Sequence, residues 1–311
     1  MRTFWNRFKG PIILLITAFF WGTTFVAQSL GSDYIGPFTY NASRFLTTGI
    51  ILLIYIAIKR KIKKDSYKLL DNKTKSTKWI YTMALFVGIS LFIGASLQQM
   101  GINLTKSPSK SGFISTLYML FVPIVGILWH KKVKPILFVY LLIALLGSFL
   151  IAYTGSFYFE LGDILTFFCA IGFAFQIAII DLVNPYIDSV YLSAIEFIVA
   201  GLLSLIISIF KEEFIISNYI QALPAIFYAA IFSGCIAFTF QIIGQKYTEP
   251  TIASMIMGLE SVFSLISGVL VLHEVLLINQ WIGSLLVLLA VMLSQIDLKR
   301  RKDYAKKKEK E

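Results

Sequence analysis

Ten long apolar runs recur along the 311 residues of this chain, and they restrict the folds open to it. They cover about residues 12–30, 37–58, 79–99, 108–128, 135–153, 161–180, 188–210, 219–241, 250–272 and 278–296. Each is close to the roughly 20 residues that a helix needs to span about 30 Å of hydrocarbon. Lipid offers the backbone no hydrogen-bond partners, so runs of this length are expected to be helices. We therefore predict an all-α integral membrane protein with ten transmembrane helices.

The composition agrees with a membrane protein. Hydrophobic residues make up 57% of the chain and charged residues 14%, whereas a soluble domain is about half apolar and a quarter charged. The first run follows Arg2, Arg7 and Lys9, as a signal peptide would, but it continues without a small-residue cleavage site. Cys169 and Cys235 both fall inside apolar runs, which indicates buried core residues and not a disulfide framework.

The formal net charge of +11 is distributed unevenly over the expected loops. Three basic residues precede the first helix, nine lie in residues 59–78, three follow the fourth helix, one is Lys246, and eight lie in the tail after the tenth helix. If ten helices alternate in direction, these 24 positions share one side, and the other side has only Lys106, Lys110 and Lys211. The positive-inside rule then predicts a multi-pass protein of the cell membrane with both termini in the cytoplasm. We assign the basic charge to topology and to contact with the lipid bilayer, not to nucleic acid.

The two halves of the chain contain similar segments. Residues 101–105 (Gly-Ile-Asn-Leu-Thr) resemble residues 244–248 (Gly-Gln-Lys-Tyr-Thr), and one residue of slack then aligns Pro108 with Pro250. Each segment joins the third and fourth helices of a set of five. Because five is odd, the second set enters the membrane in the opposite direction, which predicts two inverted-topology repeats. The predicted units are a first five-helix repeat, residues 11–154, a second, residues 160–297, and a basic cytoplasmic tail, residues 298–311.

Several short motifs follow one another in a fixed order. They are Phe20-Trp21-Gly22-Thr-Thr-Phe25, Arg44-Phe45, the segments that begin at Gly101 and Gly244, Leu259-Glu260-Ser-Val-Phe263, His273-Glu274 and Trp281-Ile-Gly283. Together they resemble the EamA-type branch of the drug/metabolite transporter superfamily. Met119 and Ser261 depart from the pattern, because the family often has proline there. The resemblance implies ten helices, two five-helix repeats and a central substrate cavity.

Glu260 lies near the middle of the ninth run and Tyr118 occupies the matching position of the fourth. A charged carboxylate near the bilayer midplane costs about 2.5–3.5 kcal/mol even on lenient insertion scales. The functional interpretation makes the two residues opposite walls of one cavity, in which Glu260 binds an amine or a proton. The alternative is a buried hydrogen-bonded pair that holds the helices together.

Other polar or aromatic residues inside the runs extend this candidate site. Trp21 could stack on a flat or cationic ligand, or it could simply pack in the core. Buried amides need partners that lipid lacks, so they should face the bundle interior, where they bind either substrate or another helix. Arg44 could snorkel to the interface or bind an anionic group of the substrate. The predicted substrate-binding residues are Trp21, Gln28, Arg44, Gln98, Tyr118, Gln176, Gln241 and Glu260.

Two intramembrane acids, Glu260 and Glu196, are candidates for proton coupling, because each could take up a proton on one side and release it on the other. Glu196 matches Arg44 in the repeat alignment. Inversion should place these two residues at opposite ends of the bundle, so we do not expect them to form an ion pair.

Motifs for ATP binding, for an esterase nucleophile and for zinc are absent from the sequence, and we predict no catalytic residues, no metal and no cofactor. The favoured function is a secondary transporter of a small organic metabolite such as an amino acid or a related zwitterion or cation. The expected direction of transport is export. It would work by alternating access around a midplane cavity, and a monomer would suffice. A non-transporting membrane sensor or scaffold and, less favoured, an intramembrane lipid-modifying enzyme are the alternatives.

Overall fold

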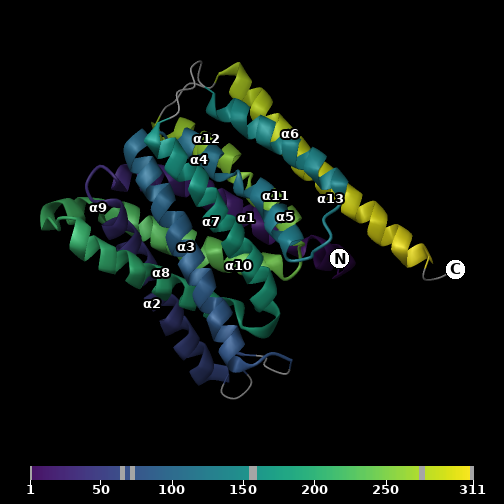
Figure 1. Cartoon of the computed structure of the whole chain (residues 1–311), viewed down its shortest axis with the longest axis horizontal. Coiled ribbons are helices and arrows are strands. Elements are labelled where there is room, and N and C mark those ends of the chain that lie inside the picture. The colour runs from purple at the N-terminus through teal and green to yellow at the C-terminus, as the bar shows by residue number, and fades with distance from the viewer. Residues whose placement is uncertain (1, 64–66, 71–73, 154–159, 273–276, 309–311) are drawn as a thin grey trace.

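The computed structural model describes residues 2–63, 67–70, 74–153, 160–272 and 277–308, which form helices and short connections (Figure 1). Ten stretches are long and apolar enough to cross a membrane, which confirms the predicted all-α fold. The first to third spans are α1 (Arg2–Gly31), α2 (Pro37–Lys63) and α3 (Thr77–Thr105). The fourth to seventh are α4 (Pro108–Ser115) with α5 (Tyr118–Leu128), α6 (Pro135–Ala152), α7 (Leu161–Val183, then η2, Asn184–Tyr186) and α8 (Ser189–Lys211). The eighth to tenth are α9 (Ile216–Tyr228) with η3 (Ala229–Phe238) and α10 (Thr239–Gln245), α11 (Pro250–Met257) with α12 (Glu260–Leu272), and α13 (Ile278–Lys308).

The crossings between helices repeat from one half of the chain to the other. Gly101 on α3 packs against Gly162 on α7, where a Cβ on Gly101 would lie 2.7 Å from the Gly162 carbonyl oxygen. Gly244 on α10 packs against Gly10 on α1 in the same way, with a Cβ on Gly10 at 3.3 Å from the Gly244 carbonyl oxygen. The sequence repeat equates Gly101 with Gly244, and the register that equates Arg44 with Glu196 equates Gly10 with Gly162. The two-repeat layout expected from the sequence is therefore confirmed by matching close contacts.

Counterpart helices of the two repeats also pack on each other. The second span, α2, contacts the seventh, α8, and the fifth span, α6, contacts the tenth, α13. Figure 1 shows α6 and α13 side by side along one edge of the bundle, away from α2 and α8. A Cβ on Gly147 of α6 would lie 2.6 Å from the Gly283 carbonyl oxygen of α13, so larger residues at this crossing would force the helices apart.

The eighth span widens into the π-helical segment η3 near its middle. Pro224 lies inside α9, five residues before this segment, and a proline inside a helix removes one backbone N–H donor. Two carbonyl oxygens of η3 accept hydrogen bonds from other helices: Thr48 Oγ1 donates to Ala230 over 2.9 Å and Thr17 Oγ1 to Ala237 over 3.0 Å. Threonines of α1 and α2 thus bond their helices to the π-helical segment.

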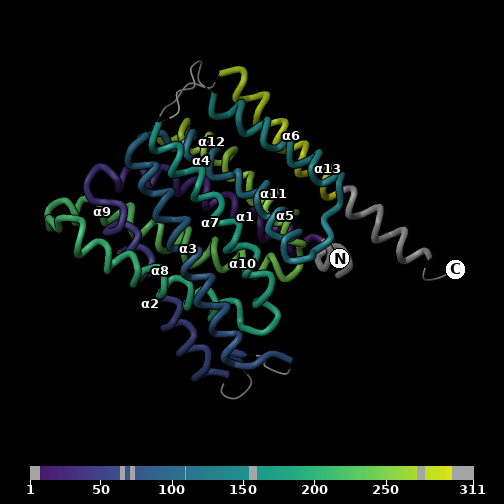
Figure 2. The backbone as a smooth tube through the Cα atoms, viewed as in Figure 1, coloured from purple at the N-terminus to yellow at the C-terminus, as the bar shows by residue number. Residues whose placement is uncertain are grey.

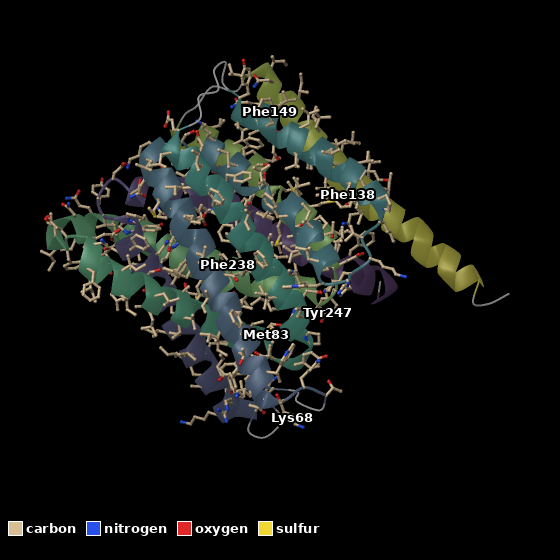
Figure 3. The ribbon with its side chains drawn as sticks, viewed as in Figure 1. Lys68, Met83, Phe138, Phe149, Phe238 and Tyr247 are labelled. Carbon is tan, nitrogen blue, oxygen red and sulfur yellow. The ribbon has the colours of Figure 1, made fainter. Side chains whose placement is uncertain are left out.

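We call the side of the bundle on which α1 begins the terminal side. The chain trace returns to it after every second span (Figure 2). Lys68 and Tyr247 lie toward this side and Phe149 toward the other (Figure 3). Here residues 67–70 dock on the connection between α7 and α8, because the Asp188 backbone N–H donates to the Leu69 carbonyl over 2.9 Å and the Tyr67 hydroxyl donates to Asp188 Oδ1 over 2.7 Å. Burial, together with that hydrogen bond, raises the pKa of Tyr67.

Candidate functional site

A cavity lies at the centre of the bundle and receives side chains from both repeats. Its volume is about 40 Å³, so it is narrow in this conformation. Seven of the eight predicted substrate-binding residues line it: Trp21, Gln28, Arg44, Gln98, Tyr118, Gln176 and Glu260. The eighth, Gln241, and the second proton-coupling candidate, Glu196, stand behind the wall and contact Gln176.

Tyr118 and Glu260 occupy matching breaks in two membrane spans. The fourth span is interrupted at residues 116–117, and α5 begins at Tyr118; the ninth is interrupted at residues 258–259, and α12 begins at Glu260. The backbone tightens at both breaks to i→i−3 hydrogen bonds, such as Ser261 N–H to the Gly258 carbonyl over 3.2 Å and Met119 N–H to the Thr116 carbonyl over 2.9 Å. The sequence placed both residues in mid-span but did not predict the breaks.

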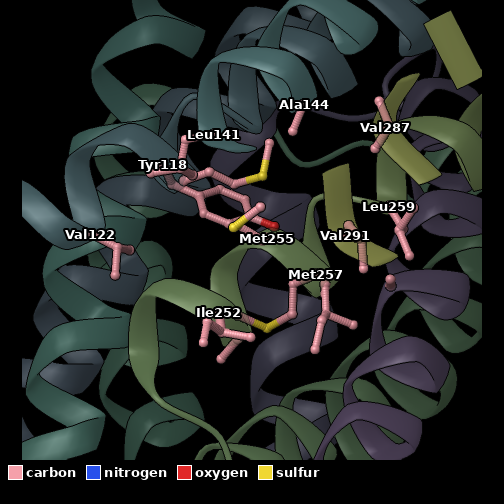
Figure 4. Close-up of a cluster of buried hydrophobic side chains, with 14 of the residues drawn as sticks. Tyr118, Val122, Leu141, Ala144, Ile252, Met255, Met257, Leu259, Val287 and Val291 are labelled. Carbon is pink, nitrogen blue, oxygen red and sulfur yellow. The ribbon is translucent and has the colours of Figure 1, made fainter. Parts of the chain in front are cut away.

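Tyr118 and Glu260 are close enough to interact electrostatically. The Tyr118 hydroxyl is buried and has no hydrogen-bond partner of normal geometry among the described residues. Apolar side chains surround the ring, with Leu141 and Met255 next to it (Figure 4). Tyr118 and Glu260 are thus a buried pair on one wall of the cavity, with the hydroxyl close to the carboxyl group.

Glutamine side chains connect α1 to α3 at another part of the wall. Gln28 Nε2 donates to Gln98 Oε1 over 3.2 Å and to Gln99 Oε1 over 3.0 Å. Gln98 Nε2 in turn donates to Ser115 Oγ over 2.9 Å. These amides both hold helices together and face the cavity, so the two interpretations of the buried glutamines are compatible.

A second amide pair connects α7 to α10. Gln241 Nε2 donates to Gln176 Oε1 over 2.9 Å, and Gln176 Nε2 donates to Glu196 Oε2 over 3.1 Å. Glu196 is fully buried, and its other carboxyl oxygen, Oε1, has no partner among the described residues. Glu196 is thus connected to the cavity through Gln176.

Arg44 enters the cavity from α2. Its Nε donates to Asn41 Oδ1 over 3.0 Å, and its guanidinium carbon lies 4.5 Å from the centre of the Phe45 ring and 5.3 Å from that of Tyr40. No ion pair joins Arg44 to Glu196 within the described residues. Asn41 was not predicted from the sequence, although its i,i+3 spacing to Arg44 places both on one helix face.

Aromatic rings form the remaining wall. The centres of the Trp21 and Phe238 rings are 4.8 Å apart, and Phe173, the repeat counterpart of Trp21, also lines the cavity. Trp21 Nε1 is buried without a hydrogen-bond partner in the described part of the chain. Phe238, which belongs to the π-helical segment η3, was not predicted as a site residue.

Charged pairs lie at the ends of the helices and not in the cavity. Lys110 Nζ is 2.7 Å from Asp163 Oδ2, and Lys131 pairs with Asp181, so the fourth span is tied to α7 near both ends. Burial lowers the pKa of Lys246, which donates from Nζ to the Ile187 carbonyl over 3.3 Å at the terminal side. No group of three or more His, Cys, Asp or Glu residues suited to a metal ion occurs among the described residues.

Ten spans, two inverted repeats and a central cavity with polar groups at broken helices define the class of multi-pass membrane transporters with internal repeats. Comparison with known proteins narrows the class. The chain matches the profile of the EamA-like transporter family over residues 8–153 and again over residues 160–295. It belongs to the EamA-like transporter family.

Similar proteins agree with this assignment. The chain is 30% identical over 294 residues to a protein of Archaeoglobus fulgidus named "Uncharacterized transporter", across 93% of this chain and 86% of that one. It is also 30% identical over 162 residues to the "Uncharacterized transporter YrdR" of Bacillus subtilis, across 50% of this chain and 47% of that one. The fold also matches that of a solved structure titled "Crystal structure of protein". The TM-score is 0.74 and the sequence identity 18%, over 94% of this chain and 99% of that one.

Proposed function

We propose that the protein is a secondary transporter of a small organic metabolite that carries an amino group and a carboxylate, such as an amino acid. The observation that carries the proposal is that Glu260 and Arg44 line one cavity without pairing with each other. The cavity therefore has an acidic part, next to Tyr118, and a separate basic part.

A molecule with both charges complements such a cavity. Its ammonium group would bind Glu260, its carboxylate would bind Arg44, and its side chain would pack on Trp21 and Phe238. Buried charges are costly without partners, so a zwitterion that supplies both counter-charges at once gains affinity from each. A plain cation would satisfy Glu260 alone.

The mechanism we propose is alternating access by movement of one repeat against the other. The matching helix crossings support it, because the same close contacts occur in both repeats and could exchange during a transition. The narrow cavity then corresponds to a state that is closed around the site. Energy would come from a gradient of the substrate or of a coupled ion.

We further propose that the protein lies in the cell membrane with its terminal side in the cytoplasm and that it works as an exporter. The orientation is supported by the basic residues, of which only Lys106, Lys110 and Lys211 lie on the other side.

Counterflow in liposomes tests the proposed function. Purified protein is reconstituted into liposomes preloaded with a mixture of unlabelled amino acids, and uptake of each labelled amino acid or matching decarboxylated amine is followed. Transient accumulation above equilibrium is expected for at least one amino acid, with weaker accumulation of its amine. Correctly folded protein that exchanges no compound of the panel would contradict the proposal and favour a sensor or scaffold.

A further inference from the structure

The guanidinium of Arg44 is a positive charge inside the membrane-spanning bundle without a counter-charge. The residue is 5% exposed, and no carboxylate forms an ion pair with it in the described ranges of the chain. The centre of the Tyr40 ring lies 5.3 Å from the guanidinium carbon, and a neutral phenol provides no counter-charge. Burying an unpaired charge in such surroundings has a high free-energy cost, and charged residues inside membrane spans generally have a partner. Among the described residues, no carboxylate lies within ion-pair distance of the Arg44 guanidinium.

The hydrogen-bond donors of Arg44 are only partly used. A guanidinium has five N–H donors in a fixed planar arrangement. The Nε donor is taken by Asn41, whereas the two terminal nitrogens make no hydrogen bond with any described residue. These nitrogens are not sealed off either, because Arg44 lines the cavity and neither belongs to the fully buried unpaired atoms. Parallel N–H groups of this kind match a carboxylate.

Asn41 determines how Arg44 is held. The side chain is fully buried, and its Nδ2 donates to the Ala95 carbonyl oxygen of α3 over 3.1 Å. This contact fixes the amide so that Oδ1 faces Arg44 Nε. Because the amide is neutral, it orients the guanidinium without cancelling its charge. An aspartate of the same size at this position would cancel it.

We infer that Asn41 is a positioning residue that holds Arg44 as an anion subsite of the cavity, and that the subsite takes the carboxylate of the transported molecule. The assignment of the bound carboxylate to a transported molecule rests on the proposed function. The anion subsite does not, because binding without transport is enough to detect it.

Three small probes separate the subsites: glycine has both charges, acetate has only the carboxylate and methylamine has only the amine. Binding to purified protein is measured by thermal stabilisation over a concentration series at constant ionic strength, with chloride as the reference anion. Wild type should respond to glycine and acetate. Asn41→Asp should weaken the response to glycine and acetate by about tenfold or more, the usual scale for a charge-assisted bond, and leave that to methylamine unchanged.

Asn184→Asp is the matched control. Asn184 is also buried, and its Nδ2 also donates to a backbone carbonyl oxygen, that of Ile242, over 2.6 Å. The control loses the same kind of amide contact away from any guanidinium, so it should keep the wild-type response to acetate. If Asn41→Asp does not fold, Asn41→Ser, which removes the support without adding charge, should also weaken the acetate response.

Two results would overturn the subsite: wild type that responds to acetate no more than to chloride, or Asn41 variants that bind acetate as the control does. If acetate and glycine bind as expected but no amino acid shows counterflow, the proposed function fails and the anion subsite stands. If glycine and acetate bind to wild type but methylamine does not, the proposal that Glu260 binds the amine is refuted.

Discussion

The Glu212 carboxylate, at the end of α8 in the second repeat, caps the first turn of α2 in the first repeat through Thr39. Glu212 Oε2 accepts the Thr39 backbone N–H over 2.7 Å and the Thr39 hydroxyl over 2.6 Å, while Oε1 accepts the Phe38 N–H over 2.9 Å. The repeat counterpart of α2 is α8, and its first N–H groups are capped from within the same segment: Asp188 accepts the N–H groups of Val190 and Tyr191. The position that matches Asp188 is Gly36, which has no side chain and leaves space for the incoming carboxylate.

Loss of this cap should destabilise the protein by about 1 kcal/mol, the usual effect of removing a helix N-cap. Glu212→Ala removes the acceptor directly. Gly36→Ala should destabilise the protein by displacing the same acceptor, since a Cβ on Gly36 would overlap the Glu212 carboxyl group. Thermal unfolding in detergent measures both variants and the double variant, which should be no less stable than Glu212→Ala alone.

Gly126→Ala is the control for the added methyl group, because a Cβ there would approach no atom of another residue closer than 3.9 Å. It should leave stability near that of wild type. Fully additive effects of Gly36→Ala and Glu212→Ala would show that the two residues act independently, contrary to the capping arrangement.

Glu260→Gln should reduce counterflow at least about tenfold, because it replaces an ionic contact with the substrate amine by a neutral one of the same shape. Expression and thermal stability should stay near wild type, since Glu260 forms no ion pair within the described chain. The measurement is counterflow of the best amino acid identified, together with unfolding of the same preparation. Normal transport with reduced stability would instead support a buried pair that only holds the helices together.

The orientation predicts opposite accessibility for two exposed loops. In a variant without Cys169 and Cys235, a cysteine in place of Lys75 should react with an impermeant maleimide only from the cytoplasm. A cysteine in place of Glu213, after α8, should react only from outside. Labelling of both from one side of intact cells would refute the alternating ten-span topology.

The sequence predicted the fold and much of the cavity wall because both follow from the low polarity of lipid. Amides such as Gln28 and Gln98 inside apolar runs need partners that lipid lacks, so they were expected to face the interior, where the cavity lies. Neither the role of Asn41 nor the π-helical segment η3 was predicted. Both depend on which backbone carbonyls of other spans lie nearby, Ala95 for Asn41 and the carbonyls of η3 for Thr17 and Thr48, and a one-dimensional pattern contains no such information.

Glu196 is the candidate for coupling transport to a proton gradient. Glu196 is buried behind Gln176, with one carboxyl oxygen bonded to it and the other without a partner in the described part of the chain. A carboxyl group in this position could exchange a proton and pass the change to the cavity through the Gln176 amide. If it does, an inward or outward pH gradient should drive uphill movement of the substrate in proteoliposomes.

Two variants assign the coupling group. Glu196→Gln keeps the size and part of the hydrogen bonding to Gln176 but cannot ionise, so gradient-driven accumulation should disappear while substrate exchange at equal pH continues. Glu260→Gln should instead impair both, because Glu260 lines the cavity. Accumulation that ignores the gradient in wild type would make the protein an exchanger or facilitator. Accumulation that survives in Glu196→Gln but not in Glu260→Gln, with exchange intact in both, would move the proton site to Glu260.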